Sequence, residues 1–231
     1  MSDDDEARAA DARAAMVERD LRRGKINDPR VLEAMARVPR HRFVPDVPID
    51  EAYADTALPT AEGQTISQPY LVARMTQLLC VDPGVRVLEI GAGSGYQAAV
   101  LAVLGADVIS VERSEALADG ARRRLDAIMP GLAPVDAPRL GRIEIVTGDG
   151  TLGYADAAPY DRILVTAAAP ALPPAYRRQL ADPGLILIPI GDREQQQLII
   201  IEQRAGQLIR RRDTACRFVP LIGEAGWGEE V

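Results

Sequence analysis

The 231-residue sequence contains one histidine, His41, and two cysteines, Cys80 and Cys216. A serine or cysteine hydrolase needs a histidine base, so any such site would have to use His41. These residues are also too few for a four-ligand zinc site, and the cysteines form no closely spaced pair. We therefore expect neither hydrolase chemistry nor a bound metal. The sparse cysteines also favour a reducing, cytoplasmic environment.

The sequence also lacks a long apolar run and an excess of basic residues. Its richest apolar stretch, residues 184–191, has the length of a strand, whereas a membrane-spanning helix needs about 20 residues. The first residues are acidic, unlike the basic start of a secretory signal. The 34 Asp and Glu residues outnumber the 27 Lys and Arg residues, giving a formal net charge of −7. We expect no membrane partner and no nucleic-acid partner, because nucleic-acid affinity rests largely on neutralising phosphates.

What the sequence does contain, from about residue 85 onward, is an alternation of short apolar strands with amphipathic helices. We expect strands at 85–90, 107–111, 143–147, 163–166 and 185–190, and helices at 96–104, after Ser114, and at 173–180. Segments 198–202 and 207–211 flank a short turn and predict a hairpin. The pattern predicts an α/β fold with a doubly wound, mostly parallel, Rossmann-like sheet, helices on both faces and an antiparallel hairpin at one edge.

Residues before this sheet are expected to form helices and a long connection. Asp28 and Pro29 mark the start of one helix, and Pro69 marks the start of another. Residues 39–66 show no sustained period, and a loop of this length is usually functional. Residues 1 to about 25 look helical, but the first dozen fit a solvated extension equally well.

The expected domain organisation follows from these elements. Residues 1–15 are treated as an N-terminal extension that could be disordered, and 16–231 as a single domain. Within it, 16–84 would supply the N-terminal helices and a lid or substrate loop. Residues 85–231 would supply the cofactor-binding sheet and the C-terminal edge strands. We expect a monomer.

Three glycines, Gly91, Gly93 and Gly95, lie between the first strand of the sheet and its helix. Doubly wound sheets bind ligands at such turns, where glycine allows the backbone to approach a ligand closely. The dinucleotide fingerprint would need a further glycine at position 96, which is Tyr96. The spacing therefore favours an adenosyl ligand without phosphates.

Acidic residues follow the next two strands. Glu112 lies nineteen residues after Gly93, at the place where a carboxylate normally accepts hydrogen bonds from ribose hydroxyls. Asp149 and Gly150 form a turn that could aim the Asp149 carboxylate at an adenine amino group. Each residue alone could equally be a turn glycine or a helix-capping acid. Together, the three strand ends favour one nucleoside site.

Four further segments resemble the protein-L-isoaspartate O-methyltransferase family, within the class I S-adenosylmethionine-dependent methyltransferases. They are Val38–Pro45 (VPRHRFVP), Gly63–Pro69 (GQTISQP), Val165–Pro170 (VTAAAP) and Phe218–Leu221 (FVPL), and the short Leu58–Pro59 adds to them. The resemblance covers about residues 16 to 222. It implies methyl transfer from S-adenosylmethionine to the free α-carboxylate of L-isoaspartyl residues in damaged proteins and peptides. The methyl ester then closes to a succinimide, whose hydrolysis returns some normal aspartate, and S-adenosylhomocysteine is the other product.

The resemblance also implies roles for individual residues. Ser67 would be the catalytic serine and contact substrate, its hydroxyl orienting the acceptor carboxylate, although from position alone it could simply cap the helix that begins at Pro69. Val219, Pro220 and Leu221 would bind the substrate peptide, with a buried edge strand as the alternative. The implied cofactor-binding residues are Gln64, Thr65, Glu89, Gly91, Gly93, Gly95, Glu112, Asp149 and Gly150.

The reaction would need no histidine base, because a carboxylate is already ionised at neutral pH. We accordingly expect His41 to be a surface residue. Arg210–Arg212 is expected to be a solvated strand end, although it could also attract acidic peptides. Two other functions remain open. One is a methyltransferase of the same fold acting on RNA or a small molecule. The other is a nucleoside-binding module without catalysis.

Overall fold

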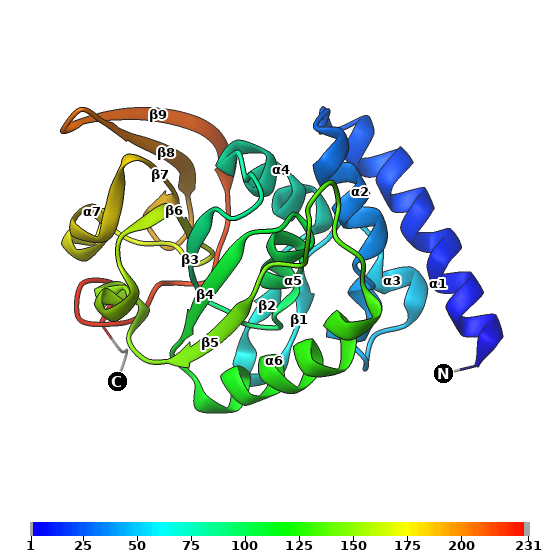
Figure 1. The fold of residues 1–231 in the computed structure, drawn as a ribbon. Coiled ribbons are helices and arrows are strands. Elements are labelled where there is room, and N and C mark those ends of the chain that lie inside the picture. Colours follow the sequence, from blue (N-terminus) through cyan, green and yellow to red (C-terminus); the bar gives the residue numbers. More distant parts are fainter. Residues whose placement is uncertain (1, 229–231) are drawn as a thin grey trace.

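The computed structural model describes residues 2–228, and its centre is a seven-stranded sheet in the order β5-β4-β3-β6-β7-β8-β9 (Figure 1). The parallel strands are β3 (Arg86–Ile90), β4 (Asp107–Glu112), β5 (Ile143–Thr147), β6 (Tyr160–Val165) and β7 (Leu180–Gly191). Strands β8 (Gln196–Arg204) and β9 (Gln207–Cys216) continue the sheet antiparallel to β7. The predicted α/β fold with an antiparallel hairpin at one edge is confirmed.

Helices cover both faces of the sheet, because successive strand residues point to opposite sides. Val87 packs in the core cluster that contains residues of α4 (Pro69–Leu79), α5 (Tyr96–Val103) and α6 (Glu115–Ile128). Its neighbour Leu88 packs in a second cluster with Tyr176 of α7 (Pro174–Gln179). Short 3-10 turns at Gly150–Leu152 and Ala155–Ala157 lie before β6, and a third follows α6 at Met129–Gly131.

The N-terminal part is helical and packs beside the sheet. It consists of α1 (Asp3–Met16), a π-helical turn (Val17–Arg22), α2 (Pro29–Arg37), a 3-10 turn (Arg40–Phe43) and α3 (Ile49–Ala52). Asp28 caps α2 with Pro29 at its first position, as predicted. Ala9 and Met16 of α1 are buried, so this helix packs against the body of the protein. The division into an extension at 1–15 and a domain at 16–231 stays a prediction, and residues 1 and 229–231 lie outside the described residues.

Several sequence expectations differ from the structure. The connection 39–66 contains short elements, including a hairpin of β1 (Leu58–Pro59) and β2 (Thr65–Ile66) around a 3-10 turn (Ala61–Gly63), all too brief to produce a visible period. β6 and β7 begin earlier than predicted, since Tyr160 pairs with Leu180 before a register shift.

The expectation that His41 is a surface residue is wrong. His41 is only 5% exposed, and its Nδ1 lies 2.8 Å from the Tyr53 hydroxyl. Burial lowers the pKa of His41. Among residues 2–228, no helix combines the length and apolar character required to cross a bilayer.

Candidate active site

The predicted site lies where the order of the parallel strands reverses, between β3 and β6. There the Gly91 N–H donates to the Val111 carbonyl at 2.8 Å, and the Thr166 N–H donates to the Ile90 carbonyl at 2.9 Å. Ligands of doubly wound sheets bind at such a switch point, beyond the carboxyl ends of the strands. A cavity of about 450 Å³ opens here. Of the predicted residues, its lining includes Gln64, Thr65, Gly91, Gly93, Glu112, Gly150, Val219, Pro220 and Leu221.

The glycine turn shapes the floor of this cavity. Gly91 has φ +95°, and a Cβ added there would lie 2.6 Å from the Thr166 hydroxyl oxygen. Gly93 has φ +51°, and a Cβ there would meet no atom within 4 Å, so open space adjoins its backbone. Gly95 differs, because it precedes α5, packs near Leu125 and does not line the cavity. A direct cofactor contact from Gly95 stays a prediction.

Glu112 is the charged group that the structure brings to the turn. Its side chain accepts hydrogen bonds from the Gly93 N–H at 2.9 Å and from the Ser114 N–H at 3.0 Å. Ser114 in turn caps α6, as predicted. These contacts fix the carboxylate at the cavity wall, and each oxygen retains capacity for a further hydrogen bond.

Glu89 lies below the turn and does not line the cavity. It is fully buried, its Oε2 accepts a hydrogen bond from the Ser110 hydroxyl, and its Oε1 has no partner among the described residues. Burial raises the pKa of Glu89 to about 8, although the Ser110 hydrogen bond acts in the opposite direction. Glu89 is thus largely protonated at neutral pH, which makes it a neutral support for the strand rather than a charged contact.

Asp149 is committed to the protein itself. Its Oδ1 accepts from the N–H and hydroxyl of Thr151 at 2.8 and 2.7 Å, and its Oδ2 accepts from the Glu224 N–H at 2.8 Å. Burial alone would raise the pKa of Asp149, but these hydrogen bonds lower it. The carboxylate therefore caps the turn at Gly150 and fastens the C-terminal tail. Its predicted contact with adenine stays untested.

Ser67 lies in a small pocket beside the cavity, together with Gly91, Gly93 and Thr166. The alternative that Ser67 caps α4 finds no support. Gln68 is the residue at the N-cap, and at the helix start the Tyr70 N–H donates to Asp55 Oδ1 at 2.8 Å. Within residues 2–228, the Ser67 hydroxyl has no hydrogen-bond partner. The Gln64 side-chain amide donates to the Glu62 carbonyl at 3.4 Å, its one side-chain hydrogen bond among the described residues.

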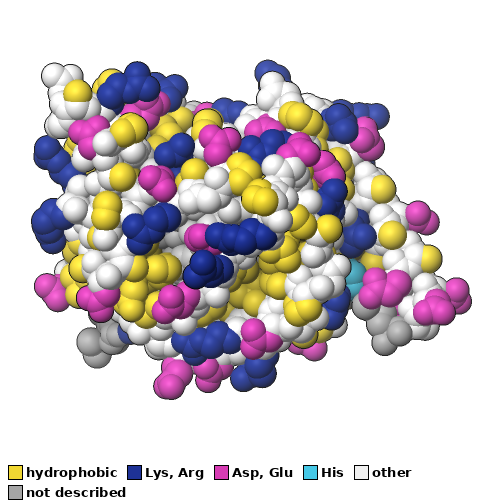
Figure 2. All heavy atoms as spheres, in the orientation of Figure 1, with side chains coloured by type: hydrophobic (Ala, Val, Ile, Leu, Met, Phe, Trp, Pro, Cys, Tyr) yellow, Lys and Arg dark blue, Asp and Glu magenta, His cyan; other side chains and the backbone are white. Residues whose placement is uncertain are grey.

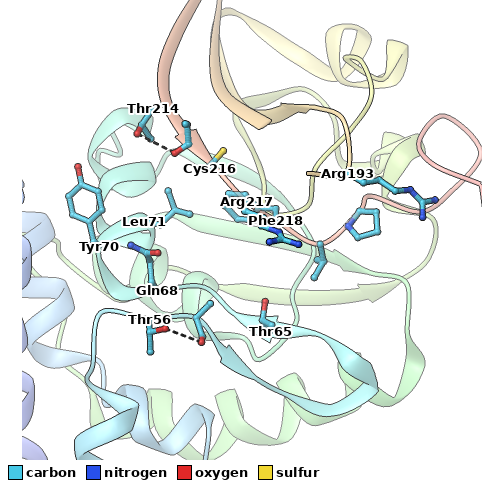
Figure 3. Close-up of a pocket in the computed structure, with 14 residues that line it drawn as sticks. Thr56, Thr65, Gln68, Tyr70, Leu71, Arg193, Thr214, Cys216, Arg217 and Phe218 are labelled. Atoms are coloured by element: carbon cyan, nitrogen blue, oxygen red, sulfur yellow. Dashed lines mark hydrogen bonds between the residues drawn. The ribbon is translucent and has the colours of Figure 1, made fainter. Parts of the chain in front are cut away.

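A second cavity, of about 580 Å³, adjoins the first and shares Thr65, Val219 and Pro220 with it (Figure 3). The segment after β9 forms one wall. Its position is set by backbone hydrogen bonds from Ala168 to the Val219 carbonyl and from Leu221 to the Ala168 carbonyl, both 2.8 Å. The Trp227 indole also donates to the Ala168 carbonyl, at 2.9 Å. The C-terminal tail therefore packs behind this wall.

Three further residues that line these cavities are Thr166, which the sequence analysis named only within the segment Val165–Pro170, and Arg193 and Arg217, which it did not name. Thr166 follows the fourth parallel strand, so its place at a strand end was a usable signal. Its hydroxyl donates toward the Ile90 and Gly91 carbonyls at 2.8 Å, which ties β6 to the glycine turn. No signal in the sequence pointed to the two arginines.

Residues 11–226 match the family model described as protein-L-isoaspartate(D-aspartate) O-methyltransferase. The chain belongs to this family. Among its curated relatives is the protein-L-isoaspartate O-methyltransferase of Methanoregula boonei, 49% identical over 218 residues, which are 94% of this chain and 96% of the relative. The enzyme of the same name from Geobacter metallireducens is 48% identical over 222 residues, covering 95% and 97%.

Solved structures of the isoaspartyl methyltransferase family share the fold. One protein-L-isoaspartate O-methyltransferase superposes with a TM-score of 0.80 at 29% identity, covering 93% of this chain and 67% of its own. A β-aspartate methyltransferase from Plasmodium falciparum, solved with S-adenosylhomocysteine, gives a TM-score of 0.77 at 27% identity, covering 91% and 98%. The resemblance predicted from the sequence is confirmed. Within residues 2–228, no group of three or more His, Cys, Asp or Glu side chains is arranged to hold a metal.

Proposed function

We propose that this chain transfers a methyl group from S-adenosylmethionine to the free α-carboxylate of L-isoaspartyl residues in damaged proteins and peptides. Family membership supports the activity. The observation that carries the site assignment is the meeting of two cavities at Thr65, Val219 and Pro220, with Ser67 beside them. One cavity would hold the cofactor and the other the peptide.

The residues of the first cavity fit an adenosyl cofactor. Open space beside Gly93 leaves room for a ligand against the backbone, and the Glu112 carboxylate can accept ribose hydroxyls. Gln64 and Thr65, on and beside the β1–β2 hairpin, would cover the ligand. S-adenosylmethionine would supply a methyl group on a positively charged sulfur.

The chain's own contribution would be positioning. An isoaspartyl carboxylate is ionised at neutral pH, so no residue has to remove a proton. The Ser67 hydroxyl, which has no partner among the described residues, would donate a hydrogen bond to the carboxylate and orient it. Holding two reactants in attack geometry can supply on the order of 7–11 kcal/mol. A closed, dry site would also favour the loss of charge as the bond forms.

Several finer assignments are proposed on the sequence alone. They are cytoplasmic location, a monomer, and no nucleic-acid or membrane partner, supported by the low cysteine content and the net charge of −7. Acidic and basic side chains are interspersed over the face in Figure 2. The chemistry needs no metal ion, because the acceptor is already a nucleophile.

The test compares labelled methyl incorporation into a peptide containing L-isoaspartate with incorporation into its L-aspartate twin. We expect label in the isoaspartyl peptide alone, released by mild base as expected of an ester. Equal incorporation into both peptides would reject the repair assignment. Cofactor binding without any transfer would instead favour a non-catalytic module.

A further inference from the structure

The wall of the peptide cavity is positively charged although the protein is acidic. Arg193 and Arg217 line this cavity, and no Asp or Glu among the described residues does so. Figure 3 shows Arg217 near the middle of the pocket and Arg193 at the end away from Tyr70. The chain has a net charge of −7, whereas the lining of this cavity carries two arginines and no acidic residue, so its local charge is positive.

Two further arginines lie along the outer edge of the sheet. A third cavity, of about 700 Å³, shares Ala215 and Cys216 with the peptide cavity and is lined by Arg210 and Arg212 of β9. Asp192 and Glu194 also line it, so the two cavities together carry four arginines against two acids. The third cavity is itself balanced, with two arginines and two acids, so the excess positive charge comes from the peptide cavity. We define the cationic surface as Arg193, Arg210, Arg212 and Arg217.

Three of these arginines have no partner within the protein. Arg210, Arg212 and Arg217 are exposed, and their side chains form no hydrogen bond or ion pair with any residue in 2–228. Arg211, on the opposite face of β9, differs because it is paired with Glu202. Arg74 nearby is likewise paired, with Asp213. Arg210, Arg212 and Arg217 thus line the cavities without a side-chain partner, whereas the Arg193 guanidinium lies over the Trp227 ring, with its Cζ 5.4 Å from the ring centroid.

The spacing along the chain sets which part of a bound peptide would meet each arginine. Extended chain rises about 3.3 Å per residue, so Arg217 is at most about 10 Å along the chain from Pro220, and Arg212 at most roughly 16 Å further on. β9 is irregular between Arg212 and Ala215, which shortens the second span. An acidic residue two or three positions from the isoaspartate would reach Arg217. An acidic residue seven or eight positions away would reach Arg212, and Arg210 lies two residues further along β9.

On this basis, and resting on the proposed function, we propose that the cationic surface selects isoaspartyl peptides with acidic flanking residues. The side chains of Asp and Glu would pair with Arg217 near the acceptor site and with Arg210 and Arg212 along β9. Each such exposed pair contributes modestly and is screened by salt. The preference should therefore be a matter of several-fold in kcat/KM and should depend on ionic strength.

The experiment uses the full-length protein and isoaspartyl peptides of equal length. One peptide is neutral. Two near-acidic peptides carry acidic residues at the second and third positions from the isoaspartate, one peptide before it and the other after it. Two far-acidic peptides carry the acidic residues at the seventh and eighth positions instead. We expect at least one near-acidic peptide to exceed the neutral peptide about fivefold in kcat/KM at low salt. This advantage should shrink at about 1 M salt.

Variants assign the effect to residues. Arg217→Gln should reduce the ratio of near-acidic to neutral kcat/KM, and Arg210→Gln/Arg212→Gln should reduce the ratio for a far-acidic peptide. Arg211→Gln is the matched control, since it removes a paired arginine on the other face of the same strand, and should keep both ratios. Equal kcat/KM on acidic and neutral peptides in the wild type would overturn the inference. So would an equal loss on both peptides in Arg217→Gln.

The neutral isoaspartyl peptide separates this inference from the proposed function. If the wild type methylates the neutral isoaspartyl peptide but not its aspartyl twin, while showing no acidic preference, only the selectivity inference fails. If it methylates neither peptide, the proposed function itself fails.

Discussion

Glu112 and Gly93 are joined by a hydrogen bond of 2.9 Å, from the glycine N–H to the carboxylate, across nineteen residues of sequence. This contact fixes the end of β4 against the glycine turn after β3. A second hydrogen bond, from the Ser114 N–H, holds the same carboxylate at 3.0 Å. The proposed ribose-binding group is thereby held in place before any ligand arrives, which is the preorganisation that tight binding requires.

Glu112→Gln should weaken binding of S-adenosylhomocysteine about tenfold to a hundredfold, because the amide removes the charge and offers the neighbouring N–H groups a poorer acceptor. Calorimetric titration measures the change. Glu115→Gln, at an exposed position on the first turn of α6, is the control and should bind normally. Unchanged affinity in Glu112→Gln would remove Glu112 from the cofactor site.

Gly93→Ala should reduce cofactor affinity by more than its effect on stability explains. The added methyl group would enter the open space at the cavity, where the ligand would lie. Alanine would also have to adopt the left-handed backbone conformation of Gly93, which costs about 1–2 kcal/mol. Gly84→Ala is matched, since Gly84 also has positive φ and a Cβ added there would meet no atom within 4 Å, yet it lies outside the cavity. Thermal unfolding should fall similarly in both variants, whereas affinity should fall only in Gly93→Ala. Similar affinity in the two variants would contradict the assignment.

Ser67→Ala should lower kcat about tenfold to a hundredfold with little change in stability, because the lost hydrogen bond would be one to a charged carboxylate. The two readouts are initial rates and the melting temperature. Asp28→Ala provides the opposite pattern: it removes the cap of α2, whose side chain accepts from Arg30 at 2.9 Å, and should cost about 1 kcal/mol of stability at normal turnover. Lost stability with normal turnover in Ser67→Ala would restore the capping role.

Glu89→Gln should change how stability depends on pH. The pKa of Glu89 in the folded protein is about 8, above the ordinary value of 4.5. Below pH 4.5 the carboxyl is protonated in both the folded and the unfolded state, and its contribution to stability is fully present. As the pH rises from 4.5 to 8, the unfolded chain ionises while the folded carboxyl stays protonated, so the wild type loses stability. Glutamine cannot ionise, and the variant should lose less over this window. If the melting temperatures of the wild type and the variant changed in parallel from pH 5 to 8, Glu89 would already be ionised in the folded protein.

Much of the fold was predictable because its signals are local. The apolar run at Ile143–Thr147 matches β5 residue for residue, and Asp28 and Ser114 cap the helices that follow them. The glycine turn and Glu112 meet as expected, since strand order brings neighbouring parallel strand ends together.

The rest depends on contacts between distant segments. Asp149 is engaged by Glu224, seventy-five residues later, so its side chain binds the tail as well as its own turn. His41 is buried beside Tyr53, twelve residues later, and such a contact leaves no pattern in the sequence. Arg217 gains its place from the hairpin edge, whose strands run further than their apolar residues indicated.

A structure of the protein with S-adenosylhomocysteine and an isoaspartyl peptide tests the site assignment most directly. The measured quantity is the position of the thioether sulfur relative to Ser67 and the acceptor carboxylate. We expect the nucleoside between the glycine turn and Glu112, the sulfur facing the pocket that Ser67 lines, and the carboxylate hydrogen-bonded to the Ser67 hydroxyl. A sulfur turned away from Ser67, or a nucleoside bound elsewhere, would contradict it.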